Sequence, residues 1–492
     1  MQTTMESMMN CKEIRLTRRS AAADDVSSPA QSRRELGDEG VLDMSVTTGV
    51  RPRREGRRVA IATMVGTTIE WYDFFIYANT AALVFAQLFF EPLGAQAALL
   101  VSFATVGISF LFRPLGAIVA GHLGDRVGRK SMLVATLVLM GAATTLIGLL
   151  PTYEQAGILA PILLVLLRIL QGFSAGGEWG GAALMAVEHA PDGKRGLYGS
   201  APQLGVPIGM LLASGVLAVT TAAFGVEGFL EVGWRIPFLI GVVLLVVGFI
   251  IRRSVEESPV FLELRETKAR SKMPVLELLK KHWWLVLLAA LTFAGNNAAG
   301  YMSTGGYVLS YATTVHEMDR TAVLWCVTAA SAVWAATTLL GGWLSDRWKS
   351  RRNVYLVGYG LQILWAFPLF LLVDTQIVVM VLVSLCAWMV STGLTYGPQA
   401  AYFAEIFPSH LRYSGVSLSY ALGAILGGAF APTIATWLQQ STGWIGSVSI
   451  YLAVMAVISI VALLIIKDRW GRPLIEREES ASSESAEAIS AR

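Results

Sequence analysis

The sequence predicts an all-α integral membrane protein in which twelve transmembrane helices form two pseudo-symmetric halves of six. Of its 492 residues, 54% are hydrophobic and only 15% are charged, and the mean hydropathy is +0.57. A soluble protein needs more charge than this on its surface, and a disordered chain has fewer apolar residues. Three cysteines are too few for a disulfide framework in so long a chain.

Twelve apolar stretches are each long enough to cross a bilayer as a helix. The ninth and tenth are the least separated, with a break around Asp374. Because the number of spans is even, both termini are expected on one side of the membrane. The predicted spans are 59–88, 97–121, 131–150, 158–187, 198–222, 234–251, 284–311, 321–344, 354–373, 376–403, 414–438 and 444–466.

The polar ends of the chain are predicted to be tails. The first 58 residues contain no short apolar core with a cleavage site, so they do not form a signal peptide. The predicted parts are a disordered cytoplasmic tail (1–58), an N-terminal half (59–251), a basic cytoplasmic linker (252–283), a C-terminal half (284–466) and a cytoplasmic tail (467–492).

Basic residues give the expected orientation. Of the 38 Lys and Arg, 34 lie in the tails and in the loops that share their side, and only Arg235 and Arg320 lie on the other side. Cytoplasmic loops carry the excess of Lys and Arg, so both termini are expected in the cytoplasm, with the spans in the cell membrane.

The chain repeats itself internally. Asp125 follows the second span and Asp346 follows the eighth in similar Gly-x-x-x-Asp-Arg loops, 221 residues apart. Each carboxylate is expected to accept backbone N–H groups at a neighbouring helix start and to pair with a guanidinium, as a latch between helices. A second repeated pair follows the fourth and tenth spans. The residues expected to act in gating or structure are Arg113, Asp125, Arg126, Arg129, Glu188, Arg195, Asp346, Arg347, Glu405 and Arg412.

Several short motifs lie in and between the predicted spans, at 121–130, Arg168-x-x-Gln171-Gly172, Glu70–Phe74, Phe112–Gly116, Gly176–Gly181, Glu257–Phe261, 81–85 and 160–164. Together they resemble those of the major facilitator superfamily, and within it those of the metabolite:proton symporters. The last two segments are most similar to the shikimate transporter branch. The resemblance implies rocking of two halves around a central substrate site, and related transporters carry dicarboxylates, citrate, proline or betaine.

Charged residues inside the spans are the main candidates for ion coupling. Each costs roughly 2.5–3.5 kcal/mol at the bilayer centre, so it should face the protein interior. Glu70 and Asp73 lie on one helix face, and with Glu178 they are the candidate proton carriers. Arg168 either binds a substrate carboxylate or pairs with the acid as a switch. A static internal salt bridge is the alternative for each of these charges.

The C-terminal half carries no charge deep in a span, so its contribution to substrate binding is expected to be polar and uncharged. Tyr and Trp also anchor membrane proteins at the interface, which is the structural alternative. With Arg168, the candidate substrate-binding residues are Gln203, Asn296, Asn297, Tyr301, Tyr396 and Gln399, and Tyr402 and Trp365 are further options.

These features predict proton-coupled import of a small polar metabolite, expected to be a carboxylate such as shikimate or a dicarboxylate. A proline or betaine symporter and a non-transporting nutrient sensor remain alternatives. The five His show no ligand spacing, so no metal is expected, and no cofactor or enzyme activity is expected either. There is no phosphate-binding loop, so ATP-driven transport is not expected.

The fifth span departs from the pattern of drug efflux antiporters, and no pore element of a channel is visible. The expected partners are the metabolite, protons and the lipid bilayer, with no nucleic acid, and the protein is expected to be monomeric.

Overall fold

The computed structural model describes residues 53–253, 257, 274–303 and 307–474, and within them every regular element is a helix. In this described part of the chain, eleven helical segments are long and apolar enough to cross a membrane. The remaining predicted span is the first one in the chain, which corresponds to the helix Arg53–Thr80. Its 28 residues would extend about 42 Å. It is less apolar than the others because it carries Glu70 and Asp73. The predicted all-α membrane fold is confirmed.

Over residues 53–253 the N-terminal half contains six long helices, one for each span, joined by short helical segments. Its elements are α1 (Arg53–Thr80), η1 (Ala81–Phe85), α2 (Ala86–Leu88), η2 (Glu91–Leu93), α3 (Ala95–Val127), α4 (Arg129–Gly148), α5 (Tyr153–Ala156), α6 (Leu159–Glu188), α7 (Arg195–Gly199), α8 (Ala201–Gly228), η3 (Phe229–Gly233) and α9 (Arg235–Arg253). The six long helices are α1, α3, α4, α6, α8 and α9.

In the C-terminal half, several spans are interrupted at Gly, Pro or π-helical turns. Its elements are α11 (Pro274–Lys281), α12 (Trp283–Ser303), α13 (Tyr307–Ser310), η4 (Tyr311–Val315), α14 (Arg320–Arg347), α15 (Arg351–Val373), α16 (Val378–Tyr396), α17 (Gln399–Ile406), η5 (Ser409–Leu411), α18 (Arg412–Ala424), η6 (Ile425–Ala429), α19 (Ala431–Thr442) and α20 (Gly446–Ile465). The predicted break at Asp374 lies between α15 and α16.

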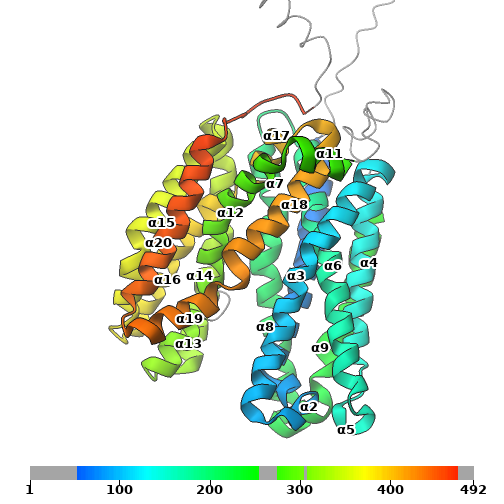
Figure 1. The fold of residues 1–492 in the computed structure, drawn as a ribbon, viewed down its shortest axis with the longest axis vertical. Coiled ribbons are helices and arrows are strands. Elements are labelled where there is room, and N and C mark those ends of the chain that lie inside the picture. The colour runs from blue at the N-terminus through cyan, green and yellow to red at the C-terminus, as the bar shows by residue number, and fades with distance from the viewer. Residues whose placement is uncertain (1–52, 254–256, 258–273, 304–306, 475–492) are drawn as a thin grey trace, which may run out of the picture. The chain divides into compact units, whose positions relative to one another are not determined.

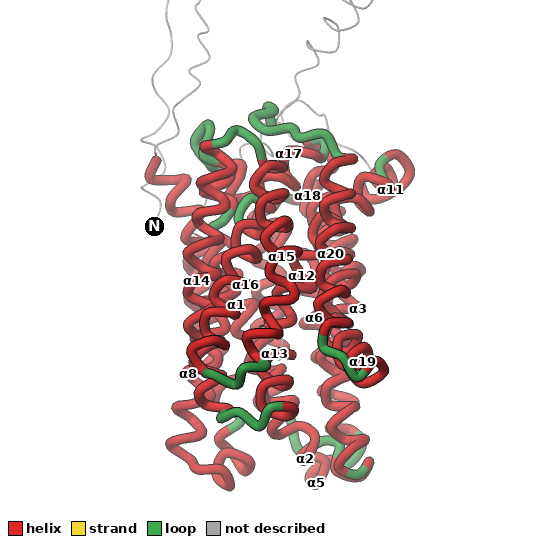
Figure 2. Tube along the Cα trace, turned by 90° about the vertical axis from the view of Figure 1, so that its left-hand side faces the viewer, coloured by secondary structure: helices red, strands yellow, loops and turns green. Residues whose placement is uncertain are grey.

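Helix packing repeats between the two halves. The pairs α1–α8, α3–α6 and α4–α9 of the first half correspond to α12–α18, α14–α16 and α15–α20 of the second. Between the halves, α3 packs on α18 and α14 packs on α7 and α8. In Figures 1 and 2, α11 and α17 lie at one end of the helices, and α2 and α5 lie at the other.

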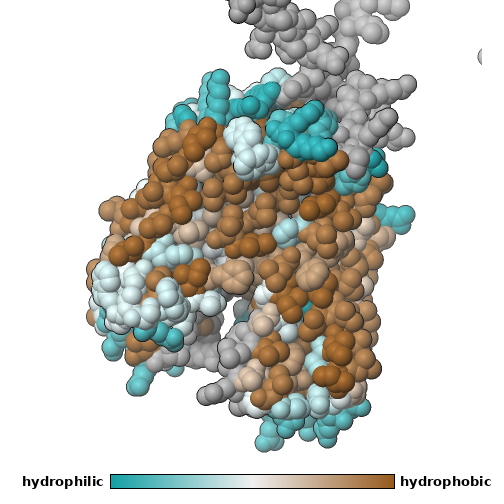
Figure 3. All heavy atoms as spheres, viewed as in Figure 1, coloured by the Kyte–Doolittle hydropathy of each residue, from teal (hydrophilic) through white to brown (hydrophobic). Residues whose placement is uncertain are grey.

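Close helix contacts depend on small residues. A Cβ added at Gly172 of α6 would lie 2.2 Å from the carbonyl oxygen of Ser109 on α3, and one at Gly116 would lie 1.8 Å from that of Phe173. Without a hydrophobic driving force between helices in lipid, such close backbone approach supplies much of the packing. Apolar side chains cover the flanks of the helices, and hydrophilic ones gather at the ends (Figure 3).

Candidate functional site

A buried chain of hydrogen bonds links Asp73 on α1 to Arg168 on α6. The hydroxyl of Thr144 on α4 donates to Asp73 Oδ2 at 2.7 Å. Gln171 Nε2 donates to the same hydroxyl oxygen at 2.8 Å, and Arg168 Nη1 donates to Gln171 Oε1 at 3.0 Å. All four side chains are buried. A change in the charge of Asp73 can therefore reach Arg168 through two intervening side chains.

Arg168 is held firmly within the N-terminal half. Its Nε donates to the carbonyl of Thr105 at 3.3 Å, and its guanidinium carbon lies 3.9 Å from the centre of the Tyr77 ring. This cation–π contact and the bond to Gln171 fix its orientation. Arg168 is not among the residues that line the cavity between the halves. Of its two predicted roles, this geometry favours the switch partner of the acid.

Glu178 on α6 pairs with Arg252, which lies near the end of α9. Arg252 Nη2 donates to Glu178 Oε1, and its Nη1 donates to the carbonyl of Leu133 on α4. A Cβ added at Gly66 on α1 would collide with this guanidinium, so the arginine fills the space among four helices. The sequence interpretation had placed Arg252 in the linker. In the structure it belongs to α9 and is only 4% exposed.

Glu70 lies close to the other charges of this half, but it forms no ion pair with any of those that the structure describes. It is 2% exposed, and no atom of the described residues hydrogen bonds to its Oε2. Glu178, Arg113, Arg252 and Asp73 all lie within electrostatic range of it. The three candidate proton carriers are therefore brought together inside the N-terminal half.

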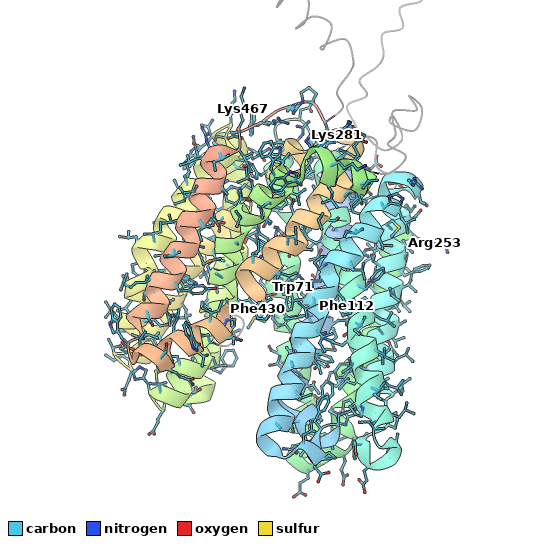
Figure 4. All side chains as sticks on the ribbon, in the orientation of Figure 1. Trp71, Phe112, Arg253, Lys281, Phe430 and Lys467 are labelled. Carbon is cyan, nitrogen blue, oxygen red and sulfur yellow. The ribbon has the colours of Figure 1, made fainter. Side chains whose placement is uncertain are left out.

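A cavity of about 30 Å³ lies where the two halves meet. By volume it holds about two water molecules. In Figure 4, Trp71 is labelled between the two groups of helices, and the surface in Figure 3 is hollowed between α19 and α3. The lining includes four of the predicted substrate-binding residues and five aromatic rings in total. It consists of Trp71, Val206, Asn296, Asn297, Gly300, Tyr301, Trp334, Tyr396 and Tyr420.

Gln203 and Gln399 meet across the halves, outside that cavity lining. Gln203 Nε2 donates to Gln399 Oε1 and to the Tyr396 carbonyl, both at 3.3 Å. Its own Oε1 accepts from Trp179 Nε1 at 2.7 Å. The Trp179 ring stacks on that of Tyr420, with centroids 3.8 Å apart. This amide pair therefore lies next to the cavity, because Gln203 bonds to Tyr396 of its lining and is three residues before Val206 on α8.

At the end that carries α17, charged contacts join the halves. Asp346 accepts from the backbone N–H groups of Gly196 and Leu197 at 2.9 and 2.8 Å, at the start of α7. Arg351 pairs with Asp346 at 2.5 Å and with Glu405 at 3.1 Å. We call the six residues of these contacts and their repeat the latch: Glu188, Arg195, Asp346, Arg351, Glu405 and Arg412.

In each of the two remaining latch pairs, an arginine of one half contacts a glutamate of the other half. Arg195 reaches Glu405 at 3.5 Å, and Arg412 reaches Glu188 at 3.6 Å. Both arginines also donate to carbonyls of the segment after α20, those of Arg472 and Leu474. In this conformation the latch end is closed.

Other predicted gating residues are placed differently. Arg126 and Arg347 are exposed, and for Asp125 and Arg129 the structure describes the backbone but not the side chains. Arg113 lies far from the latch on α3, buried among the Phe110, Trp71 and Phe74 rings. The predicted tail 1–58 lies outside the described residues up to position 52, and most of the predicted linker lies outside them as well.

Sequence reasoning missed Thr144, Gln171 as a hydrogen-bonding residue, Arg252 and Arg351. Arg351 could have been found from the repeat, because it lies five residues after Asp346 as Lys130 does after Asp125. Thr144 gives no signal in the sequence, since a threonine in an apolar helix usually bonds to its own backbone. In the described part of the chain, no group of three His, Cys, Asp or Glu is placed to hold a metal ion.

Comparison with known proteins places these features in context. The sequence model of the Major Facilitator Superfamily matches residues 63–425. The inner membrane metabolite transport protein YhjE of Escherichia coli (strain K12) is 40% identical over 418 residues, which cover 84% of this chain and 94% of that protein. The shikimate transporter of the same organism is 38% identical over 435 residues, which cover 88% and 97%.

More distant relatives and solved structures are also transporters. A putative proline/betaine transporter of Staphylococcus aureus (strain N315) is 33% identical over 413 residues, which cover 83% of this chain and 88% of that protein. Among solved structures, the proton:xylose symporter XylE bound to 6-bromo-6-deoxy-D-glucose has the same fold, with a TM-score of 0.69 at 16% identity. That alignment covers 86% of this chain and 98% of the other.

Proposed function

This chain belongs to the Major Facilitator Superfamily, and we propose that it imports a small polar metabolite together with protons. It is a multi-pass membrane transporter and not an enzyme. The proposal concerns the coupling ion, the direction and the substrate class.

The observation that carries proton coupling is the set of three buried carboxylates in the N-terminal half. Burying an acid inside a membrane protein costs free energy, so such residues are retained mainly where they serve a function. A buried carboxyl group can bind and release a proton as its surroundings change. Asp73 is the best candidate for the carrier, because the chain through Thr144 and Gln171 connects it to Arg168. Glu70 and Glu178 are the further candidates.

The substrate is proposed to be a carboxylate such as shikimate or a dicarboxylate. Two relatives at 38–40% identity, named as a shikimate transporter and a metabolite transport protein, support this class. Asn296, Asn297, Tyr301 and Tyr396 on the cavity wall offer amide and hydroxyl groups to its polar substituents. A proline or betaine substrate is the second candidate, supported by the 33% identical relative and by the aromatic rings of the wall, which suit a cationic nitrogen.

Alternating access is proposed to depend on the latch. Its closure at the end that carries α17 favours access from the opposite end, and its release would reverse the access. The excess of Lys and Arg supports assigning the latch end and both termini to the cytoplasm.

Purified protein in proteoliposomes tests the proposal. Uptake of labelled shikimate, succinate, proline and glycine betaine is measured with and without an imposed pH gradient. We expect one of them to accumulate only when the gradient is present. Asp73→Asn should then exchange that solute across the membrane without concentrating it. Accumulation of a solute that is unaffected by collapsing the gradient would refute proton coupling.

A further inference from the structure

Arg113 stands out as a buried arginine that forms no ion pair with any described residue, although Glu70 lies within electrostatic range of it. It lies in the middle of α3 and is 3% exposed. Its guanidinium carbon lies 4.5 Å from the centre of the Phe110 ring and 5.9 Å from that of Trp71. Within the described part of the chain no hydrogen bond reaches its Nε, and no carboxylate lies within ion-pair distance of its guanidinium. A charge held this way in a membrane protein is expected to have a functional partner.

The other deep arginines of this half differ in this respect. Arg252 is paired with the carboxylate of Glu178, and Arg168 is hydrogen bonded to Gln171 and to the Thr105 carbonyl. Each of them uses two guanidinium nitrogens in bonds to the protein, although Arg168 Nη2 and Arg252 Nε have no partner among the described residues. Arg113 forms no such bond to a described residue, so it has more donors left for a ligand than the other two.

Arg113 also faces the interface between the halves. The ring of Phe110, on which it rests, contacts the ring of Tyr301 on α12 with centroids 5.8 Å apart. Tyr301 and Tyr420 both lie within electrostatic range of Arg113. Trp71, Tyr301 and Tyr420 all line the cavity, so the guanidinium lies directly behind its wall. A rotation of one of these rings would expose it to the cavity.

We propose that Arg113, and not Arg168, binds the carboxylate of the transported metabolite, with Trp71, Tyr301 and Tyr420 enclosing the bound anion. This rests on the proposed import of a carboxylate. A guanidinium offers parallel N–H donors that match a carboxylate, and their bonds are strongest where water is excluded. The aromatic wall provides that exclusion. The site would therefore distinguish a carboxylate from its neutral ester.

The test uses the purified full-length protein and two matched pairs of probes. Thermal stability is measured with shikimate against methyl shikimate, and with succinate against dimethyl succinate. We expect the wild-type protein to be stabilised by an acid and not by its ester. Arg113→Gln should lower the affinity for that acid about 10- to 100-fold, the range for loss of one charge-assisted hydrogen bond. Arg113→Lys should recover part of it, because it restores the charge but not the fork.

Two controls separate this role from a structural one. Arg168→Gln should still distinguish acid from ester. Arg113→Gln without ligand should be as stable as wild type, because it breaks no ion pair within 4 Å among the described residues. The assignment is overturned if Arg113→Gln binds the acid normally, if Arg168→Gln abolishes the distinction, or if the wild type prefers the esters. It is also overturned if Glu70→Gln restores the function of Arg113→Gln, since Glu70 would then be its partner.

The result is independent of proton coupling. Uptake that needs Arg113 but ignores the pH gradient would support the anion site and refute the symport. Gradient-driven uptake of a neutral solute would support the symport and refute the anion site.

Discussion

Arg412 on α18 pairs with Glu188 at the end of α6, with Nη1 3.6 Å from Oε1, and so joins the C-terminal half to the N-terminal half. The repeat of this contact joins Arg195 to Glu405 at 3.5 Å. In each case the acid and the arginine seven residues after it bind to the other half instead of to each other. Opening of this end must therefore break two symmetry-related contacts, which favours a two-state change.

Asp346→Asn should weaken the latch without touching the cavity. The substitution removes the ion pair with Arg351 and one of the two acceptors used by the start of α7. Loss of a charge-assisted hydrogen bond is worth about 1.5–3 kcal/mol, so the open population should rise roughly 10- to 100-fold. Transport should fall while equilibrium substrate binding is mostly kept.

The population change can be measured by thiol labelling. A cysteine at Ser200, which lies against Gly342 of the other half, should react faster in the Asp346→Asn protein, with the native cysteines replaced by Ser. Arg347→Gln, at an exposed neighbouring position, is the control and should label like the parent. Equal rates for the two variants would show that Asp346 does not hold this end closed. Asp125→Asn is expected to act like Asp346→Asn, by the repeat.

Thr144→Val should uncouple transport from the proton gradient. Valine keeps the shape of threonine but lacks the hydroxyl that joins Asp73 to Gln171. Substrate exchange should persist while the accumulation ratio falls severalfold. Thr145→Val is the matched control, because among the described residues the Thr145 hydroxyl bonds only to the carbonyl of Gly141 on its own helix. Full accumulation by Thr144→Val would exclude this chain of hydrogen bonds from coupling.

Arg252→Gln should destabilise the N-terminal half. The substitution leaves Glu178 as a buried acid without its partner, and breaking a buried ion pair costs about 3–5 kcal/mol. The melting temperature should fall clearly, and adding Glu178→Gln should recover part of the loss. Arg253→Gln changes the adjacent exposed arginine and should melt like the wild type. The same melting temperature for both single variants would argue against a structural role of the pair.

Gly172→Ala should separate α3 from α6. The added methyl group would lie 2.2 Å from the Ser109 carbonyl oxygen, and a backbone atom cannot move aside alone. We expect a lower melting temperature and weaker transport. Gly107→Ala on α3 is the control, since a Cβ there meets no atom of the described residues within 4 Å. It should be neutral or stabilising by about 0.5–1 kcal/mol. A harmless Gly172→Ala would mean that the two helices pack less closely than described.

The acids of the first span were identifiable from sequence because a charge in an apolar stretch is conspicuous. Glu70 and Asp73 are both buried, as the cost of charge in lipid requires. The residues around them were not identifiable. Thr144, which bonds to Asp73, and Arg252, which pairs with Glu178, come from other helices. Nothing in the order of residues says which faces of α1, α4, α6 and α9 will meet.

A helical membrane transporter with a duplicated plan could be predicted without the structure, because hydropathy, the distribution of Lys and Arg, and the spacing of repeated motifs are properties of the chain alone. The tertiary structure was needed to show that Glu188 pairs with Arg412 and that Arg351 bridges Asp346 and Glu405. It also shows that Arg113 forms no ion pair with any described residue, whereas Arg168 is hydrogen bonded through Nε and Nη1. Ion pairs depend on distances of a few Å between helices far apart in sequence. Those distances are set by glycine contacts such as Gly172 against Ser109 and by the way the halves close, which no local pattern encodes.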